Sequence, residues 1–184
     1  MTGTERRERF DRLFDEHFRA LLGYALRRVE EPADAADVAA ETLLVAWRRL
    51  EQVPTGDEAR PWLFGVARRV LANQHRGERR RDALADRLRE AVTAMPVEAP
   101  PAGDAELVRE AMDRLRPRDR EVLALVCWEG LDPAQAAAAL GIPAATARTR
   151  LHRARARMRK ELAALGWSWS AAHSASVLPL EEGS

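Results

Sequence analysis

The sequence predicts an all-α protein built as two small helical modules joined by a linker. Three observations support this fold class. Apolar residues recur every three or four positions along much of the chain, as they do on one face of a helix. A proline- and glycine-rich segment at residues 91–103 interrupts this pattern. Beyond it, residues 131–162 are expected to form a short helix, a tight turn and a long basic helix. The 184 residues suffice for one domain or two small ones.

Composition narrows the class of protein. Hydrophobic residues make up 46% of the chain and charged residues 32%, which is typical of a soluble globular protein. No run of eighteen apolar residues is present, so no membrane insertion is expected, and the charged start MTGTERRERF does not resemble a secretory signal. Cys127 is the only cysteine, which excludes an internal disulfide and a zinc site built of several cysteines. We therefore expect a cytoplasmic protein.

The first helix is expected over residues 7–29. Its apolar face predicts the core side chains Phe10, Phe14, Phe18, Leu21, Leu22, Ala25 and Val29. His17 lies beside this face, and no ligand role is expected for it.

The second helix is expected over residues 34–50, after a break at Pro32 and with Asp34 as its N-terminal cap. Its inner stripe comprises Val38 or Ala39, Leu43, Ala46 and Leu50. A second, mixed face comprises Asp37, Glu41, Leu44 and Arg48. This face is either a solvated exterior with ion pairs along the helix or a docking surface for a partner protein, and composition does not separate the two.

A loop and a basic helix follow. Residues 51–60 are predicted to be a loop because Pro54, Gly56 and Asp57 are turn residues. Pro61 is expected to start a third helix, with Leu63, Val66, Val70 and Leu71 facing inward. The other side of that helix carries Trp62, Arg68, Arg69, Asn73, Arg76, Arg79, Arg80 and Arg81. Such a side can bind a nucleic-acid backbone and exposed bases, and a merely charged surface is the equal alternative.

The second module is expected to begin with helices at residues 104–115 and 117–130. The side chains predicted to be buried are Leu107, Met112 or Ala111, Leu115, Val122, Leu125 and Val126. Cys127 belongs to the apolar side and is expected to act as a small buried hydrophobe. Beyond Leu165 no helical period remains.

A helix-turn-helix pattern lies at residues 131–162. Asp132 can cap a short helix, with Pro133 at its first position and Gln135 as its capping-box partner. Gly141 stands where a helix commonly ends in a left-handed residue, and Pro143 can open the next helix. The stripe expected to be buried in that helix comprises Ala147, Leu151, Ala154, Met158 and Leu162.

The second helix of this pattern concentrates positive charge. From residue 148 to residue 161, seven basic side chains stand against one acidic side chain, a net charge of +6, whereas the whole chain carries +1. An arginine-rich second helix is typical of one that enters the DNA major groove. A solvated basic face is the alternative.

The order and spacing of these motifs resemble those of a bacterial RNA polymerase sigma factor of the extracytoplasmic-function group, the smallest kind, which has only regions 2 and 4. The resemblance rests on DAADVAAETLLVAWRRL, on RPWLFGVARRVLANQHRGERRR and on LRPRDREVLALVCWEGLDPAQAAAALGIPAATARTRLHRARARM. With the first helix it covers about residues 8–82 and 104–162. It implies region 2 at residues 7–85, a linker at 86–103, region 4 at 104–165 and a tail without an assigned role at 166–184.

The resemblance also implies roles for particular residues. The second helix would dock on the clamp helices of the polymerase β′ subunit through Asp37, Val38, Glu41, Leu44 and Trp47. The loop at residues 51–58, with Val53 and Pro54, would capture a base flipped from the non-template strand of the −10 element. The third helix would contact the −10 DNA through Trp62, Arg68, Arg69, Asn73 and Arg76. The second module would rest on the β flap and read the −35 element in the major groove through Thr146, Arg148, Thr149, His152 and Arg153.

Four positions depart from the usual family pattern. Ala40 stands where a glutamine is common, and Arg69 stands where an asparagine is frequent. Val53 replaces an aromatic residue that some members have in the capture loop, and Ala145-Thr146-Ala147 replaces a commoner Gly-Thr-Val. The departures concern individual contacts, above all the preference for −10 bases, and leave the architecture intact.

The main hypothesis is a transcription initiation factor that binds core RNA polymerase, directs it to −10 and −35 promoter elements and helps to open the −10 region. An anti-sigma factor is a further expected partner. The alternative is a stand-alone helix-turn-helix regulator that binds an operator through residues 131–162 without core polymerase. The sequence contains no paired-carboxylate, Ser-His-Asp, phosphate-loop or metal-ligand pattern, so we expect no catalytic residue, metal or cofactor.

Overall fold

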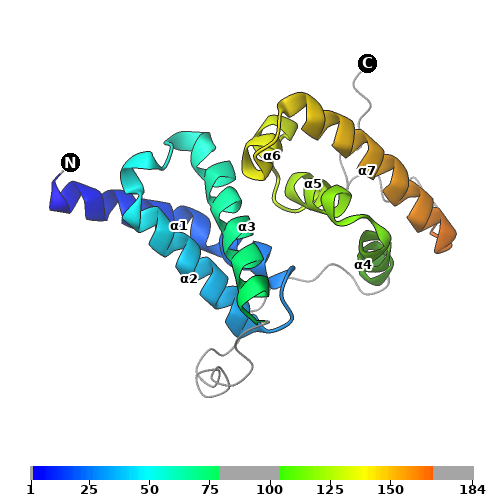
Figure 1. Ribbon diagram of the computed structural model, residues 1–184, viewed down its shortest axis with the longest axis horizontal. Coiled ribbons are helices and arrows are strands. Elements are labelled where there is room, and N and C mark those ends of the chain that lie inside the picture. Colours follow the sequence, from blue (N-terminus) through cyan, green and yellow to red (C-terminus); the bar gives the residue numbers. More distant parts are fainter. Residues whose placement is uncertain (1, 79–103, 168–184) are drawn as a thin grey trace. The chain divides into compact units, whose positions relative to one another are not determined.

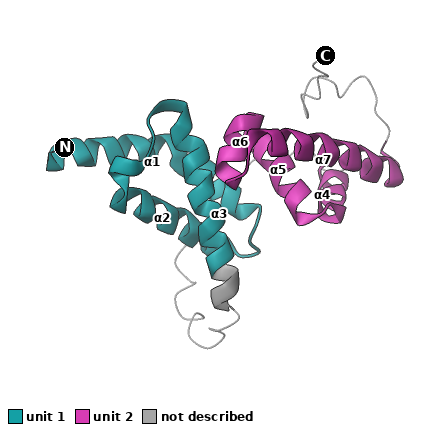
Figure 2. Ribbon diagram, turned by 45° about the horizontal axis from the view of Figure 1, so that its top comes forward, with its two compact units in different colours: residues 1–97 teal, residues 98–184 magenta. Residues whose placement is uncertain are grey.

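The computed structural model describes residues 2–78 and 104–167, and every regular element in these residues is a helix (Figure 1). The all-α fold class is confirmed. The chain divides into two compact units, residues 1–97 and residues 98–184 (Figure 2). The predicted linker at residues 86–103 and the tail from residue 168 lie outside the described residues, so the exact module boundaries stay a prediction.

The first unit consists of three helices, α1 (Gly3–Leu26), α2 (Pro32–Arg48) and α3 (Ala59–Glu78), and each packs on the other two. Tyr24 on α1 and Phe64 on α3 are each 1% exposed, and their ring centroids lie 5.1 Å apart. Leu50 and Leu63 are buried in the same core. The three helices therefore share one apolar core.

Helix α1 begins four residues earlier than predicted, because Thr2 caps it. The Thr2 hydroxyl accepts from the Glu5 amide, and the Glu5 carboxylate accepts from the Thr2 amide at 2.7 Å. The buried side of the helix comprises Leu13, His17, Leu21, Tyr24 and Ala25.

The prediction of a phenylalanine stripe in the core is wrong for Phe14. Its side chain is 39% exposed and stacks on Phe18, with the ring centroids 4.9 Å apart, while Phe10 is half-buried. The buried stripe starts one residue earlier, at Leu13, and each residue turns the helix by about 100°. Val29 lies beyond the end of the helix.

Burial of His17 gives the first unit a pH dependence. Burial lowers the pKa of His17, and nearby Arg60 also lowers it, against a smaller raising effect of Glu16. The unfolded state therefore binds the proton more readily, and stability rises with pH in this range. We expect the urea midpoint of unfolding to fall as the pH drops below about 6.5, the ordinary histidine pKa. His17→Gln, which does not titrate, should show a smaller fall between pH 8 and pH 5.

Helix α2 and the loop after it differ from the prediction only at their ends. Pro32 occupies the first turn of α2, and Asp34 lies inside that turn, so the prediction of Asp34 as the cap is wrong. Both Val38 and Ala39 belong to the inner stripe, and the rest of that stripe is confirmed: Leu43, Ala46 and Leu50. The loop contains two short 3-10 turns, Leu50–Gln52 and Gly56–Glu58, and α3 starts two residues before Pro61.

The second unit consists of α4 (Asp104–Arg114), α5 (Pro117–Cys127), α6 (Pro133–Leu140) and α7 (Ala144–Ala164). Helix α7 contacts each of the other three. Its predicted stripe is confirmed, since Ala147, Leu151, Ala154, Met158 and Leu162 are all buried. Val126 and Cys127 are only half-buried, whereas Leu123 and Ala124, which were not assigned to the core, are buried.

The helix-turn-helix geometry follows the predicted residues. The Asp132 carboxylate accepts from the amides of Ala134 at 2.7 Å and Gln135 at 2.8 Å, which confirms the capping box. Gly141 has a φ of 65°, the left-handed conformation that favours glycine. Pro143 is the N-cap of α7, and the helix starts one residue later than predicted.

Candidate functional site

All five residues predicted to read the −35 element are exposed on the first half of α7. They are Thr146, Arg148, Thr149, His152 and Arg153. At 100° per residue, all five fall on the half of the helix that faces away from the buried stripe. The Thr149 hydroxyl donates to the Ala145 carbonyl at 3.0 Å, which leaves the hydroxyl oxygen able to accept. The helix therefore presents arginine, histidine and threonine side chains together, and these are donors suited to base edges and phosphates.

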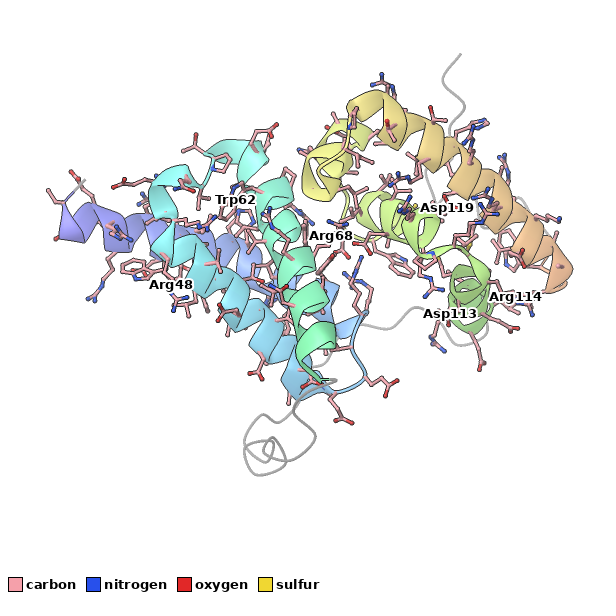
Figure 3. The ribbon with its side chains drawn as sticks, in the orientation of Figure 1. Arg48, Trp62, Arg68, Asp113, Arg114 and Asp119 are labelled. Atoms are coloured by element: carbon pink, nitrogen blue, oxygen red, sulfur yellow. The ribbon has the colours of Figure 1, made fainter. Side chains whose placement is uncertain are left out.

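Two arginines of α7 face the protein instead. Arg157 forms an ion pair with Asp119 of α5, whose side chain is 8% exposed and which points toward α7 in Figure 3. Arg155 is half-buried. Part of the positive charge predicted for the DNA side therefore holds α7 on α5, and the sequence gave no signal for this pair because its members are 38 residues apart.

The basic residues left exposed on α7 are Arg148, Arg153, Arg159 and Lys160. A second polar link stabilises the far end of the helix, where Arg114 of α4 lies 3.8 Å from Glu161 (Figure 3). The first half of α7 is therefore available to a ligand, and the second half is anchored in the unit.

Helix α2 presents a mixed face opposite its buried side. Asp37, Glu41, Leu44 and Arg48 recur at spacings of four, three and four, and all are exposed. Glu41 and Arg48 lie 3.9 Å apart, a loose surface pair that leaves both charges accessible. Leu44 adds an exposed apolar side chain between them.

Two residues predicted to belong to the α2 docking face do not fit it equally. Val38 is fully buried, so the prediction that it contacts a partner is wrong; it lies on the inner stripe, about 100° from Asp37. Trp47 is half-buried, with the Phe10 ring against it at 5.1 Å between centroids. The exposed docking candidates are Asp37, Glu41 and Leu44.

The loop after α2 projects its tip between two buried anchors. Val53 is 3% exposed, and the prediction that its side chain contacts DNA is wrong, because it packs in the core of the unit. Pro54 is half-buried, residues 55–58 are exposed, and Ala59 is buried again. Gly56 has a φ of 62°, which turns the tip of the loop. A base could reach residues 54–58 and not Val53.

Helix α3 carries the other predicted contacts to −10 DNA. Trp62 is half-buried, and Arg68, Arg69 and Asn73 are exposed. Trp62 and Arg68 both extend from α3 in Figure 3. Spacings of seven and four place Trp62, Arg69 and Asn73 on one side of the helix. The side chain of Arg76 lies outside the described residues.

Comparison with protein families matches both units. The family described as Sigma-70 region 2 matches residues 13–81, and the family described as Sigma-70, region 4 matches residues 105–158. The protein named ECF RNA polymerase sigma factor SigL, from Mycobacterium tuberculosis, is 38% identical over 159 residues, which are 84% of this chain and 89% of that protein. This chain belongs to the sigma-70 family of RNA polymerase sigma factors, in the extracytoplasmic-function group. It is a transcription initiation factor and not an enzyme, and the alternative of a stand-alone regulator is not favoured.

Other relatives agree with this family. The RNA polymerase sigma-E factor of Streptomyces coelicolor is 33% identical over 157 residues, covering 82% of this chain and 86% of that protein. Among solved structures, the sigma factor RpoE of Bartonella quintana, in complex with the anti-sigma factor NepR, matches with a TM-score of 0.62 and 26% identity over 84% of this chain and 96% of that one. CnrH in complex with the cytosolic domain of CnrY matches with a TM-score of 0.60 and 25% identity over 84% of this chain and 88% of that one.

Two searches of the described residues complete the site. Within residues 2–78 and 104–167, no three or more His, Cys, Asp and Glu side chains gather as a metal site would require. In the same residues, none of the helices combines the length and the apolar character needed to span a bilayer.

Proposed function

We propose that this sigma factor directs core RNA polymerase to a promoter with −10 and −35 elements, and that each of the three exposed surfaces described above has one task. The observation that carries the proposal is the first half of α7, where Thr146, Arg148, Thr149, His152 and Arg153 are exposed together. These five residues would read the −35 element in the major groove. The second unit would rest on the β flap of the polymerase.

The first unit would bind the polymerase and the −10 element. Asp37, Glu41 and Leu44 would dock on the clamp helices of the β′ subunit, with Trp47 at the edge of the contact. The loop tip at residues 54–58 would hold a base flipped from the non-template strand, and extruding that base costs a few kcal/mol, roughly, which contacts in the loop must offset. Trp62, Arg68, Arg69 and Asn73 would contact the neighbouring strand by stacking and by charge.

An anti-sigma factor is a proposed further partner, since the RpoE and CnrH structures are complexes with such proteins or with a domain of one. A partner that covered the α2 face or the exposed half of α7 would block polymerase or promoter binding. The proposed compartment is the cytoplasm, where core polymerase and promoter DNA are found.

The deciding experiment mixes the protein with core RNA polymerase and genomic fragments and maps the transcript starts. The proposal expects a stable complex with core and starts that share two upstream elements. A protein that binds no core and instead protects an operator alone would contradict it.

The α2 docking face gives a prediction of its own. Glu41→Arg should raise the Kd for core polymerase by about tenfold or more, because it places a like charge where an acidic side chain is proposed to bind. Glu41 is exposed, so the fold should not change. Glu8→Arg, on an exposed site of α1, makes the same change in net charge and should leave core binding unaltered. Fluorescence titration of labelled protein with core measures both, and equal Kd values for the two variants would place the docking face elsewhere.

A further inference from the structure

The first two turns of α1 hold the end of α2 and the loop that follows it. Arg6 donates from Nη2 to the carbonyl oxygen of Trp47 at 2.7 Å, and Arg9 donates from Nη2 to the carbonyl oxygen of Val53 at 2.6 Å. The two bonds are partly buried and join residues 41 and 44 positions apart in the sequence. Both arginines lie before residue 13, where the match to region 2 begins.

Arg6 fixes the end of α2. The Trp47 carbonyl belongs to the last turn of the helix, where carbonyls lack partners within the helix and the helix dipole favours a cation. The Arg6 guanidinium also lies over the Trp47 ring, 4.9 Å from its centroid, and the Phe10 ring meets the same indole edge-on. Three contacts from α1 therefore converge on one residue of α2.

Arg9 fixes the start of the loop tip. Val53 is the last residue anchored before the tip, with its side chain buried and its carbonyl bonded to Arg9. From there the chain runs through exposed residues 55–58 to the buried Ala59. A hydrogen bond from a charged donor is about twice as strong as one between neutral groups. Without it, the near end of the tip would keep only the packing of Val53 and the turn bond from its amide to Leu50.

We infer that Arg9, supported by Arg6, is a positioning residue for the loop at residues 54–58 and holds it ready to receive the flipped −10 base. This inference rests on the proposed function of that loop. A loop that is ordered only part of the time binds with an apparent affinity reduced by the fraction of time it is competent. Loss of the Arg9 bond should therefore weaken base capture and leave core binding on α2 unchanged.

The test uses holoenzyme assembled from core polymerase and the full chain, on a promoter found among genomic fragments. A fluorescent base analogue next to the flipped position of the non-template strand reports the opening equilibrium. Arg9→Ala should lower the opening constant about tenfold, in line with the loss of one charge-assisted hydrogen bond. Arg9→Lys should recover most of the loss, because one ammonium can serve the single carbonyl. Arg12→Ala, at an exposed arginine of the same helix, should open the promoter as the wild type does.

A merely structural role for Arg9 is separated by removing the captured base. On a promoter with an abasic site at that position, Arg9→Ala and wild type should open equally, because the loop then has nothing to hold. An undiminished effect of Arg9→Ala on the abasic promoter, or full opening by Arg9→Ala on the intact one, would overturn the inference. If Arg9→Ala fails to bind core, Arg9→Gln, which keeps much of the side-chain length and one neutral donor, takes its place. Failure of the wild type to bind core would instead contradict the proposed function.

Discussion

Replacing Phe64 with alanine is expected to destabilise the first unit by about 3–5 kcal/mol, the usual cost of truncating a buried phenylalanine. Phe64 is fully buried on α3 and packs on the Tyr24 ring of α1. Truncation leaves a cavity at the centre of a three-helix core that has few other large side chains. Single small domains are stable by about 5–15 kcal/mol, so this loss removes much of the stability of the unit.

Hydrogen exchange followed by mass spectrometry measures the effect unit by unit. Protection of α1, α2 and α3 should fall by roughly two to three orders of magnitude, at 1.4 kcal/mol per factor of ten. Protection of the second unit should not change, because the two units have separate cores. A parallel loss of protection in both units would show that they fold as one, and would contradict the division into two modules.

Phe14→Ala is the matched control on α1. Phe14 contributes an exposed ring stacked on Phe18, so its removal should cost less than about 1 kcal/mol. If the sequence-based assignment of Phe14 to the core were right, the two variants would unfold alike. The pair therefore tests both the core of the unit and the helical face that builds it.

The sequence predicted the helices and their caps better than the orientation of α1. Proline, glycine and aspartate act locally, so Asp132, Gly141 and Pro117 mark helix ends wherever the rest of the chain lies. Helix α1 has apolar residues on two adjacent stripes, one through Phe14 and one through Leu13 and Leu21. Periodicity alone does not decide which stripe packs inward; that depends on where α2 and α3 lie, which the sequence of α1 does not contain.

The same limit explains which site residues were predicted correctly. Residues on the outer side of a helix with one clear buried stripe, such as Arg153 and Glu41, are exposed as expected. Val38 and Val53 were assigned by position in a family motif, and both are buried, because a motif marks the segment that makes a contact and not each side chain. The contacts of Arg9 and of Asp119 join residues more than thirty-five positions apart, and no local pattern predicts them.

Arg153→Ala is expected to lower transcription that depends on the −35 element by about ten- to a hundredfold, because a good arginine contact to a guanine edge contributes roughly 1–3 kcal/mol of discrimination. Arg153 is exposed near the middle of α7, on the side opposite the buried Leu151 and Ala154, so its loss should not disturb the core. The measurement compares promoters with an intact and a scrambled −35 element. Wild type should prefer the intact element strongly, and the variant should lose most of this preference.

Arg159→Ala separates base reading from simple attraction to phosphate. Arg159 is exposed one and a half turns further along α7, so the two variants remove the same charge from the same helix. A phosphate contact weakens binding equally on every sequence and reduces the slope of log affinity against log salt by about one. Arg159→Ala should therefore lower binding to both promoters by a similar factor and keep the preference for the intact −35 element. If Arg153→Ala also kept that preference, α7 would hold the promoter by charge alone, and the −35 sequence would have to be read by other residues.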